Sequence, residues 1–72
     1  MRAEHLDVLS AALEKRRRDD SLERAVGREA RRAGLLYQDY LDIMEGVREF
    51  SRKCGQDPWD TVKQLLEEKE EQ

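Results

Sequence analysis

The feature that most constrains this chain is an apolar seam that repeats every three or four residues between positions 36 and 54. Its members follow one another at steps of 4, 3, 4, 3 and 4: Leu36, Tyr40, Ile43, Val47, Phe50 and Cys54. Heptad spacing of this kind places every member on one side of an α-helix. Tyr37, Leu41 and Met44 widen the seam into a face broad enough for two neighbours. We therefore predict a central helix over 36–53.

Three further segments show the helical period, and stop and start residues separate them. Ser21 or Asp20 can accept a hydrogen bond from the first turn of the second helix, and Gly34 suits the left-handed position that ends it. Gly55 ends the third segment, and Asp57 followed by Pro58 is a start signal for the last helix. The predicted helices span 3–17, 22–33, 36–53 and 58–66.

No segment alternates polar and apolar residues as a half-buried strand does. The predicted fold class is therefore all-α, a small four-helix bundle-like domain with short turns. We assign residues 1–66 to this domain and predict that 67–72 form a charged tail that frays.

The length and composition limit both stability and location. Of 72 residues, 38% are hydrophobic and 43% are charged, so a single chain buries only a small core and a lone monomer is marginal. Self-association or a partner is the first expectation.

No apolar run approaches the length of a membrane span. The single Cys54 excludes an internal disulfide and suits a reducing compartment, so we expect a cytoplasmic protein that does not bind membranes.

Catalysis is not expected from this sequence. His5 and Cys54 are the only conventional base and thiol nucleophile, and an active site would need them to meet with a third, orienting group. The four glycines are scattered singly, so there is no phosphate-binding loop, and no residue spacing matches a known metal site. We predict no enzyme activity, no cofactor, no metal and no small-molecule substrate.

Charge is distributed unevenly along the chain. Residues 1–34 hold nine Lys/Arg against seven Asp/Glu, a balance of +2, whereas residues 35–72 hold five against ten, a balance of −5. Four arginines share one face of the second predicted helix: Arg24, Arg28, Arg31 and Arg32. Such a stripe can contact phosphates. It can equally be a solvated face held by ion pairs with Glu29 or with the acidic half of the chain.

Residues 27–44 resemble the helix-turn-helix of small prokaryotic antitoxin-type regulators. A small residue in the first helix, a glycine in the turn and two apolar residues in the second helix stand at the family's spacing: Ala30, Gly34, Tyr40 and Ile43. The small residue lets the helices cross and the glycine takes the tight turn. An ordinary corner between two helices of a bundle fits the same residues.

The resemblance implies DNA binding and a role for five residues of the segment. Tyr37 and Gln38 would read base edges, and Arg28, Arg31 and Arg32 would contact the phosphate backbone. Three acids of the would-be recognition helix oppose phosphate contact: Asp39, Asp42 and Glu45. DNA binding is therefore the second hypothesis.

The first hypothesis is a non-enzymatic helical module for protein–protein interaction, with a regulatory role. It would form a homodimer or dock on another protein, because the broad face of the central helix exceeds what three short neighbours need. Trp59 stands in the first turn of the last helix, where it either seals the bundle or anchors a partner. The predicted interface consists of Tyr40, Ile43, Met44, Val47 and Trp59.

Overall fold

The computed structural model describes the backbone of residues 1–71 and the side chains of residues 1–68. Within these residues the chain forms four α-helices joined by short turns and contains no strand, which confirms the predicted all-α fold. The helices are α1 (Ala3–Lys15), α2 (Leu22–Arg32), α3 (Tyr37–Cys54) and α4 (Pro58–Glu71).

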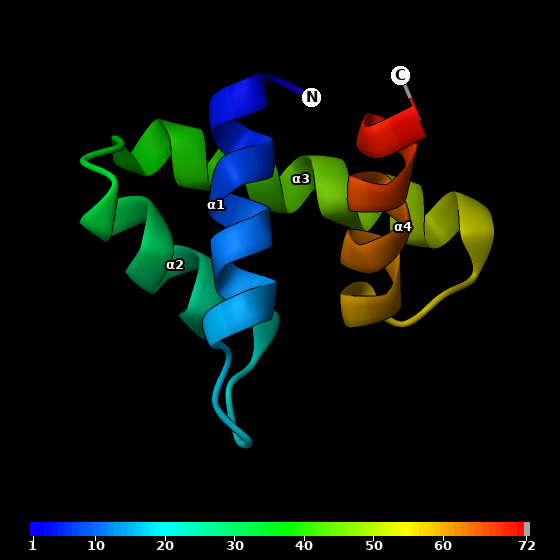
Figure 1. The fold of residues 1–72 in the computed structure, drawn as a ribbon, viewed down its shortest axis with the longest axis horizontal. Coiled ribbons are helices and arrows are strands. Elements are labelled where there is room, and N and C mark those ends of the chain that lie inside the picture. The colour runs from blue at the N-terminus through cyan, green and yellow to red at the C-terminus, as the bar shows by residue number, and fades with distance from the viewer. Residues whose placement is uncertain (72) are drawn as a thin grey trace.

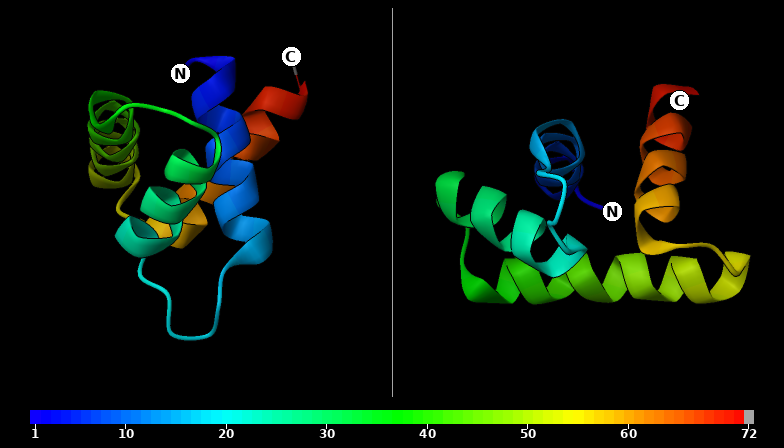
Figure 2. Two further views of the ribbon diagram at one scale, coloured as in Figure 1. Left: turned by 90° about the vertical axis from the view of Figure 1, so that its left-hand side faces the viewer. Right: turned by 90° about the horizontal axis from the view of Figure 1, so that it is seen from below.

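Helix α3 is the base on which the other three helices lie. The right-hand view of Figure 2 shows α1, α2 and α4 on the same side of α3, and in Figure 1 α1 and α4 both run across it. Helix α1 packs against α2 and α4, while α3 packs against α2 and α4. The inner face of α3 is thus covered by its neighbours, and its outer face is open to solvent.

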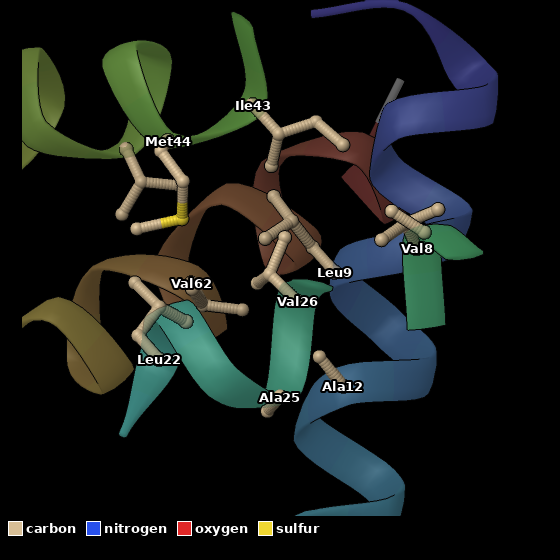
Figure 3. Packing of buried hydrophobic residues seen from close by; sticks show 11 residues of the cluster. Val8, Leu9, Ala12, Leu22, Ala25, Val26, Ile43, Met44 and Val62 are labelled. Carbon is tan, nitrogen blue, oxygen red and sulfur yellow. The ribbon is translucent and has the colours of Figure 1, made fainter. Parts of the chain in front are cut away.

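The core lies between α3 and the other three helices (Figure 3). Leu9 of α1 and Val26 of α2 meet near Ile43 of α3, and all three side chains are fully buried. Ala12 and Ala25 are also fully buried, and their small side chains let α1 and α2 approach closely. The core residues are Val8, Leu9, Ala12, Leu22, Ala25, Val26, Ala30, Ile43, Met44, Val47 and Val62.

The residues predicted to begin and end helices do so. The Ser21 hydroxyl accepts a hydrogen bond from the Arg24 N–H at 3.2 Å, at the start of α2. The Asp57 carboxylate accepts one from the Trp59 N–H at 3.0 Å, and Pro58 is the first residue of α4. Gly55 ends α3 with a φ of 64°, in the left-handed region that disfavours side chains.

Two helix boundaries differ from the sequence-based ones by more than one residue. Helix α1 ends at Lys15 because the next segment turns, and the Arg17 N–H donates to the Asp20 carboxylate at 2.8 Å. Helix α4 continues to Glu71, through most of the segment that we predicted as a frayed tail. Leu65 and Leu66 pack against the core and hold the preceding turn, and glutamate and lysine extend a helix at little cost. Gln72 lies outside the described residues.

Shortening Leu9 should test whether these helices share one core. Because its side chain is fully buried, we expect Leu9→Ala to lower the free energy of unfolding by about 2–5 kcal/mol. Chemical denaturation followed by circular dichroism measures this loss. Leu41→Ala is the matched control, because Leu41 is 41% exposed. This substitution should change the free energy of unfolding by less than about 1 kcal/mol. Equal effects of the two substitutions would contradict the observed core.

Candidate functional site

The largest concave surface of interest lies between α2 and the start of α3. It is an open groove of about 790 Å³, which we call the α2–α3 groove. Helix α2 supplies one wall, and the turn and first residues of α3 supply the other. The lining residues are Glu23, Arg24, Gly27, Arg28, Ala30, Arg31, Arg32, Leu35, Leu36, Tyr37 and Tyr40.

The groove is strongly basic although the chain is acidic. Four arginines and one glutamate line it, a formal charge of +3, whereas the whole chain carries −3. The arginines lie together because residues four and three positions apart share a helix face. The net negative charge therefore lies on the rest of the molecule, and the groove is locally basic.

Not every arginine of the groove is available to a partner. Arg28 lies 2.9 Å from the Asp20 carboxylate and 3.5 Å from that of Glu29. Its hydrogen bond to Asp20, aided by the Arg17 N–H, lowers the pKa of the Asp20 carboxyl. Among the residues that the structure describes, the side chains of Arg24 and Arg31 are exposed and make no ion pair. These two guanidinium groups are thus the ones free to bind.

Exposed apolar side chains stand beside the free arginines. Leu36 and Tyr37 are 74% and 73% exposed, and Leu41 follows one turn later; we call these three the apolar patch. The Tyr37 ring stacks on the ring of Tyr40 with centroids 5.7 Å apart. Large apolar side chains rarely gather at a surface without a function, so the patch is the strongest sign of a binding role.

The turn between α2 and α3 determines where the patch lies. Gly34 adopts a φ of 76°, which ends α2 and redirects the chain. Leu36 then takes an extended conformation as the residue before α3, and its side chain falls outside the helical seam. The Leu36 N–H donates to the Asp39 carboxylate at 3.2 Å, so Asp39, in the first turn of α3, binds the backbone of the residue before the helix.

Asp39 also joins the start of α3 to α1. One of its oxygens lies 3.2 Å from Nε2 of the buried His5, and Arg2 lies 3.9 Å away. The contact with His5, the Leu36 N–H and the charge of Arg2 together lower the pKa of Asp39. The start of α3, which carries the apolar patch, is therefore held by a hydrogen bond within its own first turn and by contacts with the N-terminal part of the chain.

The structure places most of the predicted self-association residues in the core. Ile43, Met44 and Val47 are 0%, 3% and 1% exposed, and Tyr40 is half-buried against α2. The prediction assumed that three short helices leave part of α3 uncovered, but all three lie on its inner face (Figure 2). Any surface for self-association must therefore be formed by other residues.

Trp59 belongs to the bundle. Its half-buried ring packs against the core, and the Arg16 guanidinium lies 4.9 Å from the ring centroid. This cation–π contact joins the end of α1 to the start of α4. Of the two roles that the sequence left open, this geometry matches the one in which Trp59 seals the bundle.

The residues assigned to nucleic-acid contact are largely brought together. Arg28, Arg31, Arg32 and Tyr37 all line the α2–α3 groove. Gln38 lies outside it, exposed, with its amide nitrogen 3.1 Å from the Asp42 carboxylate. Sequence reasoning missed the exposure of Leu36 and Leu41, because both were assigned to the buried face.

His5 and Cys54 lie far apart. His5 contacts Asp39 near the start of α3, whereas Cys54 is the exposed last residue of that helix. At 1.5 Å per residue, these positions are about 22 Å apart along the helix axis.

In the part of the chain that the structure describes, no three metal-ligating side chains gather at one point. None of the described helices is both long and apolar enough to cross a lipid bilayer.

The Asp39 contacts predict a pH dependence of stability. A carboxyl whose pKa is lowered in the folded state stabilises the fold above its ordinary value of 3.8, and this contribution disappears as the pH falls through the lowered value. We expect the free energy of unfolding to fall below about pH 4, and to fall less steeply in Asp39→Asn. Denaturant titrations at several pH values measure both slopes. Asp42→Asn, the same change one turn away, should keep the wild-type slope; a wild-type slope in Asp39→Asn would contradict the contact's role.

Comparison of the chain with protein-family models, with curated proteins and with solved structures gave no match.

Proposed function

We propose that this protein is a non-enzymatic helical module for protein–protein interaction, with a regulatory role, and that the α2–α3 groove is its binding surface. The observation that carries this proposal is the exposure of Leu36 and Tyr37, each nearly three-quarters open, beside unpaired arginines. Tyrosine and arginine are enriched among the residues that dominate binding energy at interfaces. We place its action in the cytoplasm, where the exposed free thiol of Cys54 stays reduced.

The composition of the groove defines the partner's chemistry. A partner must supply apolar side chains that cover Tyr37 and Leu36 and exclude water from them. It must also supply carboxylates at the rim of the groove that pair with Arg24 and Arg31. An acidic helix with apolar residues on one face offers both, because residues at positions i and i+4 project together. The proposed partner segment is therefore an acidic amphipathic helix that lies along the groove.

DNA binding is the second candidate, and specific observations favour it. Gly34 has the left-handed conformation that a tight turn needs, and Ala30 and Ile43 are buried where the two helices of such a motif meet. Asp39, which would repel phosphates if exposed, is instead occupied by His5 and the Leu36 N–H. The basic wall of the groove then supplies backbone contacts.

The outer face of α3 favours protein binding over DNA binding. In a helix-turn-helix the second helix enters the major groove and presents its exposed side chains to the bases. Here Tyr37 and Gln38 at the start of that helix are followed by Leu41, Asp42 and Glu45, all exposed. Two carboxylates between phosphate backbones are repelled, and a leucine forms no hydrogen bond with a base edge.

Two synthetic helical peptides should test the proposed partner chemistry. Both carry leucine and phenylalanine at positions i and i+4; one surrounds them with glutamate and the other with lysine. We expect the acidic peptide to bind, and to shift the NMR amide signals of residues that line the groove. The basic peptide should bind at least about tenfold more weakly, a difference of about 1.4 kcal/mol.

Matched pairs of arginines provide the control for this experiment. Arg24→Ala with Arg31→Ala removes two exposed charges from the groove and should weaken acidic-peptide binding about 2- to 30-fold, at roughly 0.2–1 kcal/mol per pair. Arg48→Ala with Arg52→Ala removes the same charge from the far half of α3 and should leave binding unchanged. Equal binding of the two peptides, or equal loss in the two double variants, would contradict the proposal.

Fluorescence anisotropy with labelled duplex DNA should distinguish the second candidate. At about 150 mM salt we expect no submicromolar binding, because the exposed acids of α3 oppose the phosphates. Should the protein bind DNA, Arg31→Ala with Arg32→Ala would reduce the salt dependence by up to about two units, one for each lost phosphate contact. Submicromolar binding with that reduction would make DNA binding the first function.

A further inference from the structure

We propose that a second copy of this chain occupies the α2–α3 groove, so that two copies pair about a two-fold axis through their apolar patches. This inference rests on the proposed function, because it names the partner of the same surface. Three of the five residues of the predicted interface, Ile43, Met44 and Val47, are buried in the core. The surface proposed here consists of side chains that the core leaves exposed.

The chain itself carries a segment with the chemistry that the groove needs. The first turns of α3 present Tyr37 and Leu41 four residues apart on one exposed face. Next to them lie two exposed acids, Asp42 and Glu45, which we call the acidic edge. This segment is an acidic amphipathic helix with apolar anchors, as required of the partner.

The order of side chains around α3 makes the surface self-complementary. Successive residues of an α-helix are rotated by about 100°. Tyr40, which packs toward α2, is followed around the helix by Tyr37, then by Leu41, and then by the acidic edge. The free arginines of α2 therefore lie on one side of the apolar patch, and the acidic edge lies on the other.

A two-fold rotation through the patch brings opposite charges together twice. In a two-fold interface, each contact from one copy to the other is repeated in reverse. With Leu36, Tyr37 and Leu41 of the two copies in contact, Arg24 and Arg31 of each copy face the acidic edge of the other. A two-fold axis in the other direction would place the arginines of both copies against each other and the acidic edges against each other, and the two copies would repel.

The size of the surface predicts a reversible dimer. A stable interface buries about 600–1,000 Å² on each partner, and the whole chain exposes 5154 Å². The patch, both charged edges and the rim of the groove together have to supply that area. We therefore expect dissociation in the micromolar range, with monomer present at the lowest concentrations.

A charge-exchange experiment tests this arrangement with the full chain. The first variant combines Arg24→Glu with Arg31→Glu, and the second combines Asp42→Arg with Glu45→Arg. Each variant alone places like charges across the axis twice, so both should be monomers by sedimentation equilibrium at concentrations where the wild type is a dimer. An equimolar mixture restores both sets of opposite charges and should recover the dimer mass.

Two further variants keep the result interpretable. Glu67→Arg with Glu68→Arg reverses two exposed charges on α4, away from the groove, and should dimerise as the wild type does. Leu36→Ser with Leu41→Ser alters only exposed patch residues, so it should fold and shift the protein to monomer, even where a charge variant fails to fold. Far-ultraviolet circular dichroism checks the fold of each variant.

Each other outcome overturns a defined part of the proposal. A wild-type chain that stays monomeric through the micromolar range, yet binds the acidic peptide, excludes the second copy and leaves the proposed function intact. A monomer that does not bind the peptide overturns both. A dimer that none of the variants weakens uses another surface, and charge variants that stay monomeric after mixing exclude the two-fold pairing.

Discussion

The burial of one face of α3 is the constraint on which this structure depends. A chain of 72 residues has material for a single core, and α3 is the longest of its helices. Helices α1, α2 and α4 all lie on that side of α3 (Figure 2), and their buried apolar residues form one core with those of α3. Ile43 and Val47 are consequently shielded from water by residues of other helices.

This arrangement separates the polar chemistry of the molecule into two groups. Polar contacts that join neighbouring segments form the first group: the ion pair of Arg28 with Asp20 near the first turn, and the hydrogen bond between His5 and Asp39 that joins α1 to α3. Arg24 and Arg31 take no part in these pairs within the described structure. Pairing these two arginines within the chain would add little stability, because exposed ion pairs contribute little. They therefore matter chiefly for what they can bind.

Local signals were enough to predict the fold class and most helix ends. Ser21, Asp57 with Pro58, and Gly55 act on backbone groups within a few residues, so their effects are visible in sequence. The arginine stripe of α2 was predictable for the same reason, because helical spacing alone brings its members together.

The parts that were not predicted depend on tertiary contacts. The seam was assigned from Leu36, but that residue precedes the helix, and helical spacing does not place its side chain. His5 and Asp39 are 34 residues apart in sequence, and nothing local indicates that they meet. Met44 and Val47 are buried because three helices lie on the same side of α3. A count of apolar residues does not reveal on which side the helices lie.

The one-sided packing of α3 also has a consequence for how such a chain can change over evolution. Positions on the inner face are held by the core, where almost any substitution costs stability. Positions on the outer face, such as Leu41 and Asp42, make few contacts that the fold requires, so they are free to vary at little cost. Two descendants of this sequence could therefore keep one scaffold while acquiring different binding preferences, and the divergence would be recorded in exposed residues rather than in the core.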